Sequence, residues 1–205
     1  MTRAILIWVA LAAAIGVPLA AAAMSPLLEW RNAVYIAAGF AGIVGLGLMF
    51  VQPLLIGGYL PRLAGRIGRR VHLWIGGTLV VAVVIHVGGL WITSPPDMID
   101  ALTFTSPTPF SPFGVVAMWA IFAVALLAAF RRRLRPRTWR LAHMLLAIVI
   151  VGGTVIHGLL IEGTMEFVSK AVLCALVLAA TVKVMAGLPI WRKRPPPRSE
   201  SIAPP

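Results

Sequence analysis

The four histidines of the chain fall into two pairs with the same spacing. His72 precedes His86 by 14 residues, and His143 precedes His157 by 14 residues. In an α-helix this interval is close to four turns, so the second imidazole lies about 40° from the first and about 21 Å further along the axis. Neutral imidazole is a good axial ligand for haem iron. Two such helices side by side would present two ligand pairs at two depths, the geometry that holds two haems one above the other.

The composition places these histidines in a membrane. The chain has 205 residues, 60% hydrophobic and 12% charged, and its mean hydropathy is +0.95. A soluble domain of this length cannot bury so much apolar surface, which favours an integral membrane protein. The basic residues behind the net charge of +12 lie between apolar segments, so they indicate membrane orientation and not nucleic-acid binding. The single cysteine, Cys174, excludes a disulfide framework and a cysteine-based metal cluster.

Six apolar segments are long enough, or nearly so, to cross a bilayer. They cover approximately residues 4–23, 33–56, 71–93, 113–130, 140–161 and 167–188. The sequence therefore predicts an all-α fold, an integral membrane bundle of six transmembrane helices. One haem-binding domain would occupy residues 1–190, and a basic, Pro-rich cytoplasmic tail residues 191–205. The first segment also has the pattern of a secretory signal; we interpret it as a retained helix, and its cleavage would leave five.

Lys and Arg residues divide the predicted loops into two sides. One side holds Arg3, the arginine groups at 62–70 and 131–140 and the basic tail, whereas the other holds only Arg31 and Lys170 among acidic residues. Cytoplasmic loops accumulate Lys and Arg, so both termini are predicted to be cytoplasmic, in a multi-pass protein of the cell inner (plasma) membrane. The third and fifth segments then run in the same direction. This pairs His72 with His143 on the cytoplasmic side and His86 with His157 on the outer side.

A simpler interpretation makes the histidines ordinary interhelical hydrogen-bonding residues. Their number and equal intervals favour haem ligation, since unpartnered ionisable groups are costly at membrane depth. A zinc or copper site is disfavoured because the two depths are too far apart for one ion. Arg69, Arg70 and Arg140 precede the inner ligands by one turn or less and are candidate partners of haem propionates, although positive-inside charge alone explains them equally well. Glycines near the ligands fit either a flat macrocycle or close helix packing: Gly76, Gly77, Gly88, Gly89, Gly152, Gly153 and Gly158.

Two motifs carry a family resemblance. Arg70-Val-His72-Leu-Trp74 with its interval to His86, and Trp139-Arg140-Leu-Ala-His143 with its interval to His157, resemble the ferric reductase-like transmembrane domain. That family includes the membrane parts of ferric reductases and NADPH oxidases and the haem-binding subunit of the periplasmic methionine sulfoxide reductase system. The resemblance covers roughly the second to sixth segments. It implies two haems b between the third and fifth helices, with His72 and His143 on the inner iron and His86 and His157 on the outer iron.

One departure from the family concerns the electron donor. Ferric reductases and NADPH oxidases carry flavin- and nicotinamide-binding domains after the last helix, but only about 15 residues follow Trp191, without a Gly-rich phosphate loop. We therefore expect no FAD or NAD(P) site in this chain. Electrons would come from a separate flavoprotein reductase or from quinol in the lipid bilayer.

The function predicted from these observations is transmembrane electron transfer through two bis-histidine haems. Electrons would pass from the cytoplasmic or membrane side to a periplasmic acceptor, either ferric iron or a periplasmic reductase. The chain would then be an oxidoreductase component, and the 93–112 loop with Asp97 and Asp100 would be the candidate docking surface for the acceptor. Two alternatives remain open: a quinol-oxidising, cytochrome b-type membrane anchor of a redox complex, and a non-redox membrane scaffold or transporter.

Overall fold

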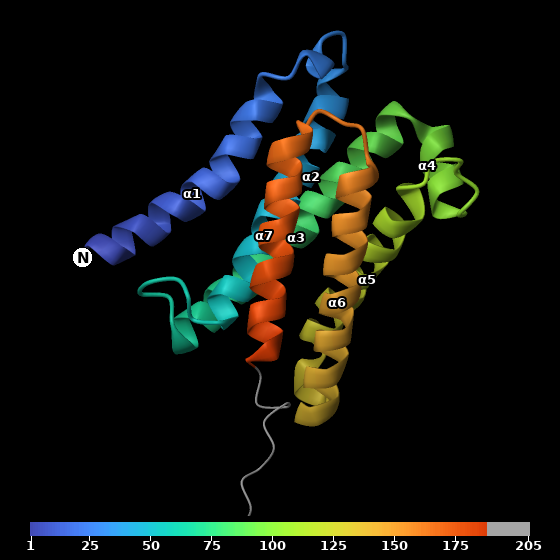
Figure 1. Ribbon diagram of the computed structural model, residues 1–205. Coiled ribbons are helices and arrows are strands. Elements are labelled where there is room, and N and C mark those ends of the chain that lie inside the picture. The colour runs from blue at the N-terminus through green and yellow to red at the C-terminus, as the bar shows by residue number, and fades with distance from the viewer. Residues whose placement is uncertain (188–205) are drawn as a thin grey trace, which may run out of the picture.

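The computed structural model describes residues 1–187, and its regular elements in that range are all helices (Figure 1). Six are long: α1 (Thr2–Ala23), α2 (Ala33–Ile56), α3 (Gly65–Thr93), α5 (Ser111–Ala129), α6 (Pro136–Leu160) and α7 (Phe167–Ala186). Each of the six is long and apolar enough to cross a membrane, which confirms the predicted six-helix fold. The third and fifth predicted segments correspond to α3 and α6. The predicted tail, residues 191–205, and the domain boundary at 190 lie outside the described residues.

Side chains just before two of the helices fix where they begin. Asn32 precedes α2, and its Oδ1 accepts a hydrogen bond of 2.7 Å from the backbone N–H of Val34. Glu166 precedes α7, and its carboxylate accepts bonds from the N–H groups of Val168 and Ser169. These bonds satisfy backbone donors that have no partner inside the helix. Both caps lie at the same end of the bundle, where α2 and α7 start.

Helix α3 begins earlier than predicted, at Gly65 instead of residue 71. The additional residues include Arg66, Arg69 and Arg70, which break the apolar pattern but are all exposed. Long arginine side chains keep their charge in water while the backbone hydrogen bonds continue. Gly65 itself adopts a φ of +65°, a conformation that L side chains rarely adopt, so the chain reverses here before the helix proceeds.

The connection between α3 and α5 contains a short helix that the sequence analysis described only as a loop. Helix α4 spans Pro95–Leu102, with prolines at its first positions. The Ser94 hydroxyl donates a 2.5 Å hydrogen bond to the carboxylate of Asp97 in the first turn. Proline is well suited to the first helical position because its missing N–H needs no partner there. Two 3₁₀ turns, Pro26–Leu28 and Arg131–Arg133, lie in other connections.

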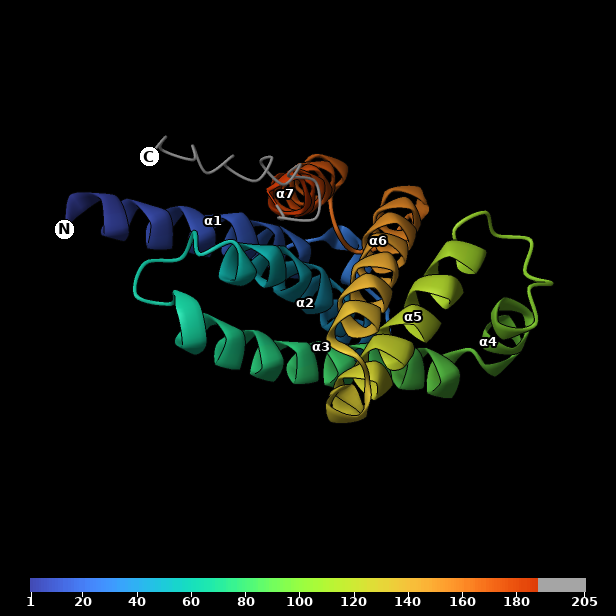
Figure 2. The same cartoon turned by 90° about the horizontal axis from the view of Figure 1, so that it is seen from below.

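Four of the six long helices form two antiparallel hairpins. Helix α2 packs most extensively on α3, and α5 on α6, while α7 packs on both α2 and α6 and so joins the hairpins. Figure 2, viewed along the bundle, shows α7 beside α2 and α6 and places α1 at the periphery. Helices α3 and α6, which carry the histidines, pack far less on each other than on their hairpin partners.

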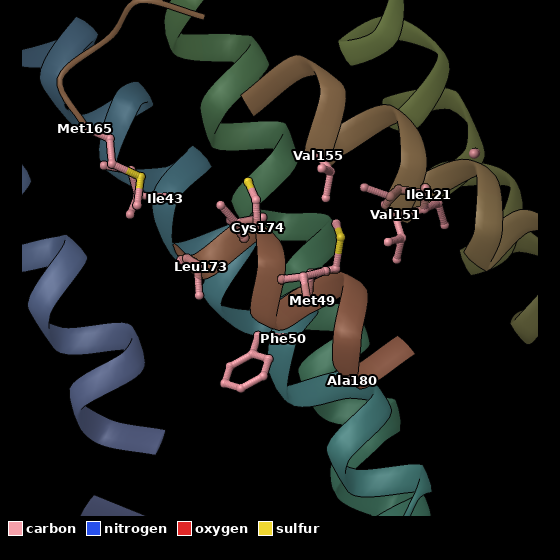
Figure 3. Close-up of a cluster of buried hydrophobic side chains, with 14 of the residues drawn as sticks. Ile43, Met49, Phe50, Ile121, Val151, Val155, Met165, Leu173, Cys174 and Ala180 are labelled. Atoms are coloured by element: carbon pink, nitrogen blue, oxygen red, sulfur yellow. The ribbon is translucent and has the colours of Figure 1, made fainter. Parts of the chain in front are cut away.

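The core lies where α7 fills the angle between the two hairpins. Leu173, Cys174 and Val177 of α7 are essentially inaccessible, with exposed fractions of 1%, 1% and 0%. Figure 3 shows Leu173 and Cys174 among side chains of α2, α5 and α6, and Val177 belongs to the same cluster. Apolar side chains also cover much of the outer surface, for example Val81 and Ile85 of α3. Such an apolar exterior is what a bilayer requires of a spanning bundle.

The two ends of the bundle differ in charge. One end, which we call the basic face, carries the two arginine groups: Arg62, Arg66, Arg69, Arg70, Arg131, Arg132, Arg133, Arg135, Arg137 and Arg140. The opposite end, which we call the outer face after its predicted orientation, carries Glu29, Arg31, Asp97, Asp100, Glu162, Glu166 and Lys170. The arginine groups predicted to share one side of the membrane therefore lie at one end of the structure.

Candidate functional site

The inner histidines lie at the same depth and in contact. His72 and His143 each stand seven residues after the first residue of their helices, Gly65 of α3 and Pro136 of α6. Their ring centroids are 6.1 Å apart, with 67° between the ring planes. Two imidazoles bonded at about 2 Å to opposite sides of one metal ion would have centroids on the order of 6 Å apart. The separation of the inner pair is therefore compatible with one shared metal ion.

The outer histidines are each held by a neighbouring helix. The ring nitrogen Nδ1 of His86 lies 2.8 Å from the backbone oxygen of Ala38 in α2. Nδ1 of His157 lies 3.0 Å from the backbone oxygen of Phe110, just before α5. A carbonyl oxygen only accepts, so Nδ1 carries the proton in both rings and Nε2 keeps its lone pair. Metal-ligating histidines commonly make this second hydrogen bond, which fixes the tautomer and the ring orientation.

A glycine one helical turn beyond each carbonyl makes room for the ring. Gly42 follows Ala38 by four residues, and a Cβ on it would lie 3.0 Å from Nδ1 of His86. Gly114 follows Phe110 by four residues, and a Cβ on it would lie 2.6 Å from Nδ1 of His157. A side chain one turn further on would cover the carbonyl, so glycine opens the backbone to the imidazole. The two outer histidines thus share one supporting arrangement on two different helices.

The inner histidines have no equivalent support. Nδ1 of His72 and Nδ1 of His143 are buried without a hydrogen-bond partner, as is Oε1 of Gln52 in α2. Gln52 lies beside His72, because its Nε2 donates a 3.4 Å hydrogen bond to the backbone oxygen of His72. The His143 ring instead stacks on Trp139, with 5.0 Å between centroids and 29° between planes. Buried polar atoms without partners are uncommon and costly, so this group of atoms points to an interaction still to be made.

All four histidines keep Nε2 available. Within residues 1–187 no hydrogen bond involves the Nε2 atom of a histidine, and none of these four atoms is among the buried atoms without a partner, so each is accessible. In that same range no group of three or more His, Cys, Asp or Glu side chains converges on one point. Each histidine pair therefore offers two nitrogen ligands, fewer than the three or four that zinc takes from protein. Two axial nitrogens suit an iron whose remaining ligands come from a porphyrin.

The predicted arginine partners lie on the basic face near the inner histidines. Arg69, Arg70 and Arg140 are exposed, and the Nε of Arg140 donates a 3.2 Å hydrogen bond to the backbone oxygen of Pro136 in its own helix. All three are free to turn towards an anionic group at the membrane surface, because none is buried.

Five of the seven glycines near the histidines divide into two kinds. A Cβ on Gly89 would lie 2.7 Å from the Cβ of Ala38, and one on Gly153 would lie 2.9 Å from the backbone oxygen of Phe113. These two allow close helix packing. Gly77, Gly88 and Gly152 have no neighbouring atom within 4 Å of a built Cβ. Close helix packing, one of the two interpretations left open, is therefore what Gly89 and Gly153 provide.

A comparison with protein family models identifies the family of the chain. The family described as "Ferric reductase like transmembrane component" matches residues 41–154, more than half of the chain. The chain belongs to this family. The resemblance predicted from the two histidine motifs is confirmed. No curated protein and no solved structure matches the chain.

The family match covers the helices that support the histidines as well as those that carry them. Gly42, Gln52 and Gly114 lie within residues 41–154, as do three of the four histidines, while His157 follows the matched range by three residues. These three supporting residues were not predicted, because they lie outside the two histidine helices that carry the motifs. Gln52 did carry a signal, since it is the only glutamine of the chain and interrupts an apolar segment. The glycines carried none, because many helices of the chain contain glycine.

Proposed function

We propose that this member of the ferric reductase-like family binds two haems b and transfers electrons across a membrane. His72 and His143 would ligate the inner iron, and His86 and His157 the outer iron. Haem, when bound, supplies a one-electron redox centre that the side chains of the bundle lack. The observation that carries the proposal is the state of the histidines: four imidazoles at two depths, each with Nε2 free of hydrogen bonds.

The residues around the histidines support this assignment. The carbonyls of Ala38 and Phe110 hold the outer rings through Nδ1 and so direct Nε2 away from their own supporting helices. Helices α3 and α6 pack little on each other, so a flat group could bind between these two histidine-bearing helices. Arg69, Arg70 and Arg140 would bind the propionates of the inner haem, since guanidinium groups bind carboxylates in a bidentate way.

The charge of the two faces supports an orientation. The basic face carries ten arginines, whereas Arg31 and Lys170 are the cations of the outer face. By the positive-inside rule the basic face would lie in the cytoplasm, and the membrane would be the cell inner membrane. Electrons would enter there from a separate flavoprotein reductase. They would leave at the outer face to ferric iron or to a periplasmic reductase docked on α4, which presents Asp97 and Asp100.

A quinol-oxidising role is the second candidate, and an apolar groove favours it. The groove lies between the outer ends of α2 and α3, where Val34, Ala38, Ile85 and Gly88 are among its lining residues. It adjoins the carbonyl that supports His86, so a membrane quinol could approach the outer site from the lipid. Reduction of the purified protein by a quinol analogue would favour this candidate, whereas reduction only by a flavin reductase would favour the first.

The test of haem binding is the reduced-minus-oxidised absorption spectrum of the purified protein, with haem measured per chain. We expect a b-type spectrum and close to two haems per chain. His72→Ala and His157→Ala should each retain close to one, because each removes a ligand at a different depth. Thr181→Val is the matched control: this buried hydroxyl bonds to the Val177 oxygen of its own helix, remote from the histidines in the sequence. A protein without haem, or histidine variants that keep both haems, would refute the proposal.

Electron transfer is tested in vesicles that contain the protein. A membrane-impermeant reductant is added outside, and a ferric chelate is trapped inside as the acceptor. Chelate reduction should require the wild-type protein and should fall to the rate of protein-free vesicles with His86→Ala. Chelate reduction at the wild-type rate by the His86→Ala protein would contradict the proposed route.

A further inference from the structure

Three buried polar atoms near the inner histidines remain unexplained by the ligand assignment alone. They are Nδ1 of His72, Nδ1 of His143 and Oε1 of Gln52. One is an acceptor and two are ring nitrogens that can donate, so their hydrogen-bonding capacities are complementary. The Gln52 side chain is already beside His72, because Nε2 bonds to the His72 backbone oxygen. A Cβ on Gly76, one turn after His72, would lie 3.3 Å from that same Nε2.

The register of α2 against α3 places Gln52 where a support for His72 would be expected. Ala38 of α2 supports His86 of α3, and the two helices are antiparallel neighbours. A step of 14 residues towards the basic face along each helix leads from Ala38 to Gln52 and from His86 to His72. At the outer level the acceptor is a backbone carbonyl uncovered by Gly42. At the inner level the position four residues beyond Gln52 is Ile56 instead of glycine. Nδ1 of His72 has no hydrogen-bond partner there, and the Gln52 side chain beside it can supply an acceptor.

The hairpin of α5 and α6 has no side-chain acceptor at the corresponding position. The same step from Phe110, just before α5, and from His157 in α6 leads to Val124 and His143. Val124 is apolar and packs against the core. His143 therefore depends on stacking with Trp139, and Gln52 is the side-chain acceptor that the register brings to the inner level.

We propose that Gln52 is a positioning residue for the inner haem, because its Oε1 accepts a hydrogen bond from Nδ1–H of His72 in the haem-loaded protein. This inference rests on the proposed function. The bond fixes the tautomer that leaves Nε2 for iron, and it increases the electron donation of the imidazole. Stronger donation favours ferric over ferrous iron, so Gln52 lowers the reduction potential of the inner haem.

The test measures both haem potentials in Gln52→Leu, Gln52→Glu and wild-type protein by redox titration. Gln52→Leu removes the acceptor, and we expect the potential of one haem to rise while the other stays constant. A tenfold change in the ferric-to-ferrous preference corresponds to about 59 mV for one electron. Gln52→Glu provides a stronger acceptor and should lower the same potential. The low-spin ferric EPR signal of that haem should shift with it, which a purely structural role of Gln52 would not cause.

Two further variants assign the affected haem and control for polarity. In the His157→Ala background only the inner haem remains, so the shift caused by Gln52→Leu should persist there. Thr181→Val removes a buried hydroxyl from another helix and should leave both reduction potentials unchanged. If Gln52→Leu loses a haem, Gln52→Glu should retain it, since the acceptor is kept.

The outcomes separate this inference from the proposed function. A wild-type protein without haem refutes both. Two haems whose potentials are the same in wild type and Gln52→Leu refute only the role of Gln52, as does a shift confined to the outer haem. Loss of haem from both Gln52 variants also refutes it, because retention of the acceptor would then have no effect.

Discussion

Gly114→Ala is the substitution for which the structure gives the sharpest expectation. A Cβ at this position would lie 2.6 Å from Nδ1 of His157 and 2.8 Å from Cε1, whereas ordinary contact begins at 3.4 Å. The ring or helix α5 must therefore move by about 0.8 Å. That movement stretches the 3.0 Å bond between His157 and the Phe110 oxygen. The added methyl group thus displaces the ring and weakens the bond that orients it.

The cost can be estimated from these two effects. Overpacking of a buried site typically costs about 1–3 kcal/mol, and a lost hydrogen bond about 0.5–1.5 kcal/mol. A combined cost of about 1.5–4.5 kcal/mol would weaken the outer haem site by about 10- to 1,600-fold. The inner site should be unaffected, since His72 and His143 do not contact Gly114. The effect is therefore expected at one haem of the two.

The assay is the rate at which the purified protein loses haem to an excess of a haem-scavenging apoprotein. We expect one fast phase and one unchanged phase for Gly114→Ala. Gly42→Ala should have a smaller effect, since its Cβ would stand 3.0 Å from Nδ1 of His86. Gly16→Ala is the control on α1, a helix without histidine, because no neighbouring atom lies within 4 Å of its Cβ. Haem loss from Gly114→Ala at the wild-type rate would show that the His157–Phe110 contact does not position a ligand.

Three further predictions concern the outer face and the arginines. Hydrogen bonds from Ser169 and Val168 N–H lower the pKa of Glu166 below its ordinary 4.5; the ionised carboxylate therefore stabilises the fold above that pH, and the stability is lost as pH falls through the lowered pKa. The melting temperature of wild type should thus fall more steeply below about pH 4.5 than that of Glu166→Gln, and equal slopes would contradict the cap. Lys170 is 5% exposed, and its Nζ donates a 2.7 Å hydrogen bond to the backbone oxygen of Ile161. Lys170→Met should therefore lower the free energy of unfolding, measured with denaturant, by about 1–3 kcal/mol, because that carbonyl loses its partner. An unchanged unfolding midpoint would show that the bond makes no net contribution to stability. Arg140→Ala should speed loss of the inner haem only, whereas Arg137→Ala, another exposed arginine of the basic face, should not; equal effects of the two would indicate general charge in place of a propionate contact.

The six apolar helices could be predicted from the sequence because each spanning helix must be continuously apolar over the bilayer thickness. The depth of the inner histidines also followed from spacing, since His72 and His143 lie equally far from charged helix starts. The start of α3 could not be predicted this way. Arg66, Arg69 and Arg70 resemble a loop in hydropathy but extend a helix beyond the apolar region. Helix α4 was missed because eight residues are too few to show a periodic pattern.

The supporting groups could not be predicted because they depend on register. Whether Gly42 or another glycine of α2 faces His86 is decided by the turn between α2 and α3 and by side-chain packing along the pair. A shift of one residue would rotate the opposing position by about 100° and remove the contact. A backbone carbonyl as the hydrogen-bond acceptor is also invisible in sequence, since every residue has one. Gln52 was the one supporting residue that its residue type made recognisable in the sequence. Its partner, His72, could be identified only once the register of α2 against α3 was known.

The hydrogen bonds to the outer histidines show which helix positions each ligand. Each hairpin contains one histidine helix and the helix that supports it: α3 with α2, and α6 with α5. The orientation of each outer ligand is therefore set within a hairpin and does not depend on how the hairpins meet. Helix α7 holds the two hairpins together through its buried side chains. The contact between α3 and α6 is consequently left thin. A planar group bound between α3 and α6 would meet outer histidines that are already oriented, so its binding would cost little side-chain entropy at the outer level. The entropy cost would be larger at the inner level, because His143 has no hydrogen bond to hold its ring.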